Sequence, residues 1–206
     1  MNKPHRPSVR SAWLVSLISV IWTVLASSIA IALGVVDHSA VLIAFGAIGF
    51  VDALGSVALV YHFHHALKHD QLAAHLERLA HRVVVIGLLA VGISAVALGV
   101  ARLVAGSSGG SSNAGVALAA ISLFVLIGLS ARKQWLAHRI GSGALLADGR
   151  LSGIGAMQAG VTLLGTGAAR WFGWDWADAV AAGVVGLVAI SVAIKTWTPA
   201  PDEIDD

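Results

Sequence analysis

Residues 40–61 read AVLIAFGAIGFVDALGSVALVY, an apolar run that contains a single charged side chain, Asp52. About 20 apolar residues are enough for a helix to cross the hydrocarbon core of a bilayer. A helix is the expected form, because lipid cannot satisfy the backbone groups of an open strand. The stretch therefore predicts a membrane-spanning helix with one carboxyl group near its middle.

The rest of the chain has the same character. Of its 206 residues, 57% are hydrophobic and only 12% are charged, about half the charged fraction of a soluble domain. This composition excludes a soluble globular domain, a disordered chain and a nucleic-acid-binding protein. The absence of cysteine excludes disulfides and thiolate metal sites. We expect an all-α polytopic membrane protein, a six-transmembrane-helix bundle with spans at residues 13–36, 40–61, 83–105, 114–131, 142–168 and 177–196.

The positive charges predict the orientation of the bundle. Every Lys and Arg except Arg102 and Arg170 falls on one side of the six-span arrangement. Arg132, Lys133 and Arg139 are assigned to the connector between the fourth and fifth spans on that side. Because cytoplasmic loops carry an excess of Lys and Arg, we expect both termini in the cytoplasm and the protein in the plasma or inner cell membrane.

The spans define the expected domain organisation. Residues 13–197 form the transmembrane domain, which includes a His-rich cytoplasmic segment at residues 62–82. Residues 1–12 are expected to be a cytoplasmic arm, and residues 198–206 an acidic cytoplasmic tail.

Asp52 is the most informative residue of the sequence. It lies near the expected bilayer midplane, where a carboxylate costs about 2.5–3.5 kcal/mol on insertion scales. Such a side chain cannot face lipid, so it must face a water-filled cavity, an ion or a polar partner. Two interpretations are open: Asp52 belongs to an ion or proton site, or it is protonated and hydrogen-bonds a neighbouring helix.

Two further acidic residues lie near the ends of expected spans. Asp148 is about one and a half turns into the fifth span, where it would line the cytoplasmic approach to Asp52 or reach water in a purely structural role. Asp178 lies at the outer start of the sixth span and is expected to cap that helix.

The His-rich segment offers a second candidate metal site. On a helix that continues from the second span, His62, His65 and His69 share one face. Neutral imidazoles in this arrangement could bind zinc or a similar divalent ion. The alternative is a solvated cationic face close to anionic lipid headgroups.

Three segments carry a resemblance to a known family. They are AFGAIGFVDALGSVALVYH at residues 44–62, SGALLADGRLSGIGAMQAG at residues 142–160 and WADAVAAGVVGLVAI at residues 176–190. Together they resemble the transmembrane domain of the cation diffusion facilitator (cation efflux) family, most of all its short bacterial members. The resemblance implies a six-helix bundle, a homodimer, and exchange of zinc or a related divalent cation for protons.

The resemblance also implies where the cargo binds. The family uses two polar residues four apart on the second helix and two on the fifth. These positions correspond to Ile48 and Asp52, and to Leu151 and Gly155. Only Asp52 has a side chain that can coordinate a cation, so the expected metal site is degenerate.

Two functions follow from these features. The first is a membrane transporter that exports a divalent metal cation by proton antiport, with Asp52, Asp148 and the His62–His69 face in contact with metal. The second is a non-transporting membrane module, a dimer partner or metal-responsive scaffold that keeps the fold. An enzyme is not expected, because no catalytic arrangement lies at useful depth. The expected partners are the lipid bilayer, a divalent cation, protons and a second copy of the chain, with no nucleic acid and no firm cofactor.

Overall fold

The computed structural model describes residues 6–66, 74–106 and 112–197, and these residues form six helices. The expectation of an all-α chain is confirmed for this part of the sequence. The helices are α1 (Arg6–Val36), α2 (Ala40–Ala66), α3 (Ala74–Ala105), α4 (Asn113–Ile140), α5 (Gly143–Phe172) and α6 (Asp175–Trp197).

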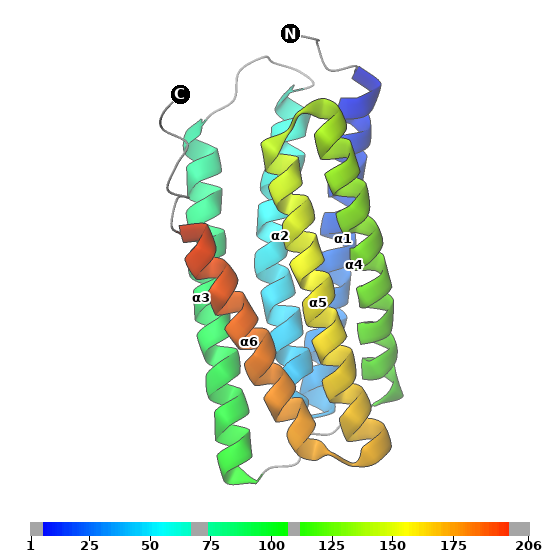
Figure 1. Ribbon diagram of the computed structural model, residues 1–206, viewed down its shortest axis with the longest axis vertical. Helices are drawn as coiled ribbons and strands as arrows, with labels where there is room; N and C mark the ends of the chain where they lie inside the picture. The colour runs from blue at the N-terminus through cyan, green and yellow to red at the C-terminus, as the bar shows by residue number, and fades with distance from the viewer. Residues whose placement is uncertain (1–5, 67–73, 107–111, 198–206) are drawn as a thin grey trace.

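Successive helices alternate in direction within one elongated bundle, so α1 starts and α6 ends toward the same end (Figure 1). We call this the terminal end. The most extensive packing joins α1 with α2, α4 with α5, and α3 with α6. The helix α2 also packs on α3, α5 and α6. Asp52 therefore lies on the helix that has the most neighbours in the bundle.

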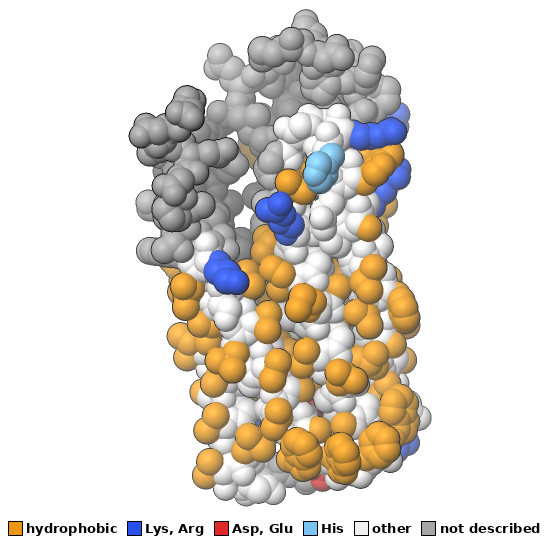
Figure 2. All heavy atoms as spheres, in the orientation of Figure 1, with side chains coloured by type: hydrophobic (Ala, Val, Ile, Leu, Met, Phe, Trp, Pro, Cys, Tyr) orange, Lys and Arg blue, Asp and Glu red, His pale blue; other side chains and the backbone are white. Residues whose placement is uncertain are grey.

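The described helices include five that are long and apolar enough to cross a membrane, namely α1, α2, α3, α4 and α6. The chain is thus a multi-pass membrane protein. The remaining helix, α5, spans 30 residues and is not among these five; it carries polar side chains such as Asp148 and Gln158, both of which are buried. On the face that Figure 2 shows, hydrophobic side chains cover the bundle, and most of the Lys and Arg side chains in view lie toward the terminal end.

The helix α4 extends to Ile140, beyond the expected end of the fourth span at residue 131. The added residues are good helix formers without Gly or Pro. The helix ends at Gly141, which adopts the left-handed conformation with φ 67°. The assignment of Lys133 to an interfacial connector is therefore wrong, because Lys133 lies within α4 and is buried.

Several glycines allow close contact between helices. A Cβ atom added at Gly46 on α2 would lie 2.7 Å from the Ser27 carbonyl oxygen on α1. One added at Gly186 on α6 would lie 2.6 Å from the Gly92 carbonyl oxygen on α3. These separations are shorter than a van der Waals contact, so small residues are required where these pairs of helices cross.

Candidate functional site

A buried ion pair joins α4 to α5. The Nζ atom of Lys133 lies 2.6 Å from Oδ2 of Asp148. The Lys133 side chain has no exposed surface, and Asp148 is only 4% exposed. The two residues face each other across the α4–α5 hairpin, on either side of the turn at Gly141. Because an isolated charge in a low-dielectric interior is very costly, each of these residues depends on the other.

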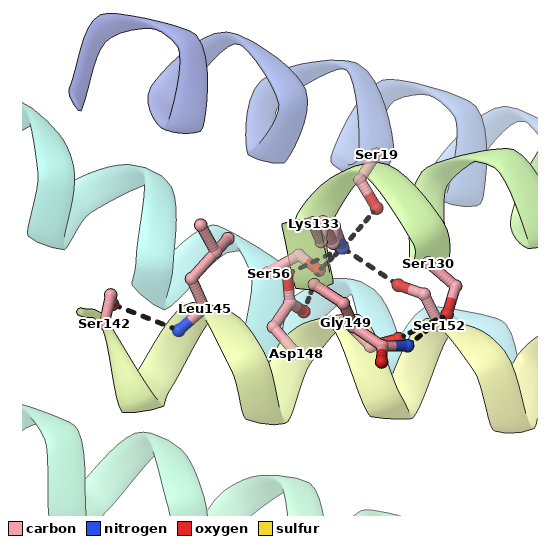
Figure 3. Close-up of polar contacts among 10 residues, drawn as sticks. Ser19, Ser56, Ser130, Lys133, Ser142, Leu145, Asp148, Gly149 and Ser152 are labelled. Atoms are coloured by element: carbon pink, nitrogen blue, oxygen red, sulfur yellow. Dashed lines mark hydrogen bonds and ion pairs between the residues drawn. The ribbon is translucent and has the colours of Figure 1, made fainter. Parts of the chain in front are cut away.

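Three serine hydroxyls complete the surroundings of this pair (Figure 3). The Lys133 ammonium donates to Ser19 on α1 at 2.8 Å and to Ser152 on α5 at 2.9 Å. Ser56 on α2 donates to Oδ1 of Asp148 at 2.8 Å and lies 3.5 Å from the Lys133 Nζ atom. An ammonium has three donors, and the Asp148 carboxylate and the Ser19 and Ser152 hydroxyls are the three nearest acceptors for them among the described residues. We call these five residues the Lys133 cluster; it connects α1, α2, α4 and α5.

A close approach of α5 to α4 makes the cluster possible. A Cβ atom added at Gly149 would lie 3.1 Å from Cβ of Lys133 and 2.9 Å from Cγ of Gln134. The Ser130 hydroxyl on α4 donates to the Gly149 carbonyl at 2.8 Å. The lack of a side chain at Gly149, next to Asp148, therefore lets the two charged residues meet.

Asp52 lies one turn of α2 from Ser56, on the side of the cluster away from the terminal end. It lines a cavity of about 40 Å³ between the helices. A space of about 10–15 Å³ already holds one water molecule, so this cavity can hold a small hydrated group. Within the described parts of the chain, the Asp52 carboxyl group has no hydrogen-bond or ion-pair partner. The charges of Asp148 and Lys133 are close enough to act on it.

The cavity contains all four positions that the family resemblance singles out. Ile48 and Asp52 on α2 face the same space as Leu151 and Gly155 on α5. Of these four, only Asp52 can coordinate a cation through its side chain. The amide side chain of Gln158, one turn beyond Gly155, also lines the cavity.

Two polar atoms at the cavity wall have no partner among the described residues. They are the indole Nε1 of Trp22 on α1 and the hydroxyl of Ser122 on α4, and both are buried. Buried polar groups of native proteins are nearly always hydrogen-bonded to protein or water. These atoms therefore indicate that the cavity holds water or a polar ligand.

Asp178 has a different role from the one expected. Its side chain is fully buried, and it accepts a hydrogen bond from the backbone N–H of Ala40 at 2.7 Å and another from the Ser39 hydroxyl. It thus caps the N-terminus of α2 and not that of its own helix. Arg102 on α3 lies 3.9 Å from the same carboxylate, so Asp178 ties together three helices at the end of the bundle opposite the terminal end.

The histidine site remains a prediction. His62 and His65 belong to the last turns of α2, but their side chains and the whole of His69 lie outside the described residues. In the part of the chain that is described, no three His, Asp or Glu side chains are grouped closely enough to hold a metal ion. Both carboxylate oxygens of Asp148 already face Ser56 or Lys133.

Lys133 is the site residue that sequence analysis missed. Its neighbours Arg132 and Gln134 gave it the appearance of an interfacial residue. The sequence feature that could have revealed it is the unbroken run of helix-forming residues up to Gly141. This run places Lys133 two turns before the end of α4. Consecutive residues of a helix point in directions about 100° apart, so Lys133 is buried while its neighbour Arg132 is exposed.

Comparison with known proteins finds no family model that matches the chain and no curated protein that is significantly similar to it.

Proposed function

We propose that this protein is a proton-coupled cation transporter in which Asp52 binds the transported cation. One observation carries the proposal: a carboxyl group without a partner among the described residues lines a cavity inside a bundle of membrane helices. The unpartnered polar atoms of Trp22 and Ser122 beside it support the presence of a polar occupant.

The chemistry of exchange follows from the isolation of Asp52. A carboxylate in a low-dielectric cavity is stable only when a proton or a cation neutralises it. The two compete for the same oxygens, so binding of a cation releases a proton and uptake of a proton releases the cation. If the cavity opens in turn to each side of the membrane, this competition exchanges cations for protons.

The Lys133 cluster would control access from the terminal end, which we take as the cytoplasmic side. It lies between the Asp52 cavity and that end, and Ser56 connects the two on α2. The charges of Lys133 and Asp148 neutralise each other, which leaves Asp52 as the uncompensated charge of the cavity. A path through the cluster requires this ion pair to separate or shift, and a buried pair resists separation. We therefore assign Lys133 and Asp148 the role of a cytoplasmic gate.

The family resemblance extends this proposal to the direction of transport and to the oligomeric state. It favours export, a divalent cargo such as zinc, a dimer, and a sixth membrane crossing by α5. The packing of α5 on α2, α4 and α6 is compatible with a crossing in which its polar residues avoid lipid.

One observation favours the alternative of a non-transporting module. Most side chains around Asp52 are apolar, among them Ile48, Leu126 and Leu151. In that case Asp52 would be permanently protonated, and no ion would exchange with it.

Flux measurements on purified protein in liposomes separate the two functions. A pH-sensitive dye is enclosed, and zinc, manganese, sodium, lithium or potassium is added outside under a pH gradient. The transporter predicts proton movement with at least one cation, loss of that movement in Asp52→Asn, and retention in Asp175→Asn, a control at the start of α6. Proton movement that is unchanged by Asp52→Asn, or absent with every cation, would reject the proposal.

A further inference from the structure

We infer that the cargo of the Asp52 cavity is a small, hard, singly charged cation of the sodium type. The inference rests on the proposed function, since it names the substrate class of the same site, and it replaces the divalent cargo that the family resemblance favours. Three properties of the cavity lead to it: its donor atoms, its charge and its size.

The donor atoms that could coordinate a cation are oxygens. They belong to the Asp52 carboxyl group, the Gln158 amide and the Ser122 hydroxyl, with the hydroxyls of Thr23 and Ser27 also at the wall. Among the described residues, the side chains that line the cavity include no imidazole and no thioether. Zinc and other borderline ions are held mainly by nitrogen and sulfur, whereas hard ions prefer carboxylate, carbonyl and water oxygens. The donor set thus favours a hard ion.

The charge of the cavity favours a monovalent ion. Asp52 contributes one negative charge, and the adjacent ion pair of Lys133 and Asp148 contributes none in sum. A divalent ion would leave one positive charge uncompensated inside the bundle, which a low dielectric penalises. A monovalent ion leaves the same net charge as a proton on Asp52, so the two can replace each other without a change in the charge of the protein.

The size of the cavity excludes a large cargo. At about 40 Å³, it has room for a few water-sized groups and is far smaller than the 300–1,000 Å³ of a site for a drug-sized molecule. A small cation with some of its water therefore fits, and an organic cation does not.

The unpartnered atoms suit a partly hydrated cation. The indole N–H of Trp22 can only donate, so it would bond the oxygen of a water on the ion. The Ser122 hydroxyl can present its oxygen to the ion while donating its hydrogen to a water. Both atoms lack a partner among the described residues, and a hydrated cation beside Asp52 would supply one to each.

Binding of radioactive sodium to the purified protein in detergent tests the inference. We expect saturable binding of about one ion per chain that weakens as the pH falls and is lost in Asp52→Asn. The Ser122→Ala variant is expected to weaken binding about tenfold, in line with loss of a hydrogen-bonding group to an ion. The control is Ser28→Ala, because Ser28 on α1 is exposed, does not line the cavity, and donates its hydroxyl to the Val24 carbonyl of its own helix.

The outcomes separate this inference from the proposed function. If the protein exchanges zinc or manganese for protons in liposomes but binds no sodium, the sodium inference fails and the transporter remains. If no cation exchanges for protons, both fail. Sodium binding that survives Asp52→Asn would place the ion elsewhere and overturn the inference.

Discussion

Replacement of Lys133 by Met is expected to be a severely destabilising change. Met keeps the length of the side chain but removes the ammonium that lies 2.6 Å from Asp148. Asp148 then stays buried with the Ser56 hydroxyl as its remaining partner. Removal of one partner from a buried ion pair costs about 3–5 kcal/mol, because it leaves a buried charge without compensation.

The second half of this prediction concerns removal of both charges. The double variant Lys133→Met with Asp148→Asn has no charge left at this buried pair. The amide oxygen of the introduced Asn side chain can still accept a hydrogen bond from the Ser56 hydroxyl. Neutral replacement of a buried pair is often tolerated. We expect the free energy of unfolding of the double variant to lie within about 1–2 kcal/mol of that of the unchanged protein. The double variant should thus be more stable than Lys133→Met alone.

The assay is reversible unfolding in mixed detergent micelles, followed by the fluorescence of the seven tryptophans. Lys195→Met is the matched control, because Lys195 is exposed on α6 and its loss should change stability by no more than about 0.5 kcal/mol. Two results would refute the reasoning. One is a loss of unfolding free energy below about 1 kcal/mol for Lys133→Met. The other is a double variant whose loss equals the sum of the losses measured for Lys133→Met and Asp148→Asn separately.

Further predictions concern packing, capping and orientation. Gly186→Ala is expected to destabilise the protein by about 1–3 kcal/mol, because the new Cβ atom overlaps the Gly92 carbonyl, whereas Gly128→Ala, with open space around it, should be neutral or better when thermal unfolding is compared. Asp178→Asn removes a charge from the N-terminus of α2 and should lower the free energy of unfolding by about 1–2 kcal/mol in the same assay; an effect no larger than that of Asp175→Asn would contradict the cap. Because the chain has no cysteine, one added at either terminus should react with impermeant thiol reagents only in inside-out vesicles, and reaction from the outer face would invert the orientation.

The sequence predicted helix ends well where the chain turns sharply. The end of α1 at Val36, the start of α2 at Ala40 and the end of α3 at Ala105 were all expected, because polar or glycine-containing connectors adjoin these positions. Toward the terminal end the expected spans of α1 to α4 were too short by five to nine residues, whereas the start of α5 and the end of α6 were predicted to within one residue. Hydropathy falls where lipid ends, but a helix with good helix formers continues into water, as α4 does to Ile140.

The candidate site could be predicted only in part. Asp52 was recognisable because a lone charge in a long apolar run has few explanations. The pairing of Lys133 with Asp148 was not, because it depends on which face of α4 meets α5 and on the missing side chain of Gly149. Likewise, Asp178 caps a helix that begins 138 residues earlier, whereas capping rules consider only the local sequence.

The most direct test asks whether water reaches position 52. In a chain without cysteine, Asp52→Cys provides a single thiol in the cavity, and Leu54→Cys provides one on the lipid-facing side of α2, where Leu54 is 50% exposed. Only an ionised thiol reacts quickly with small water-soluble reagents, so the reaction reports contact with water. The transporter predicts rapid labelling at position 52 in membrane vesicles and slow labelling at position 54. Labelling at position 52 that is no faster than at position 54 would contradict an accessible ion site.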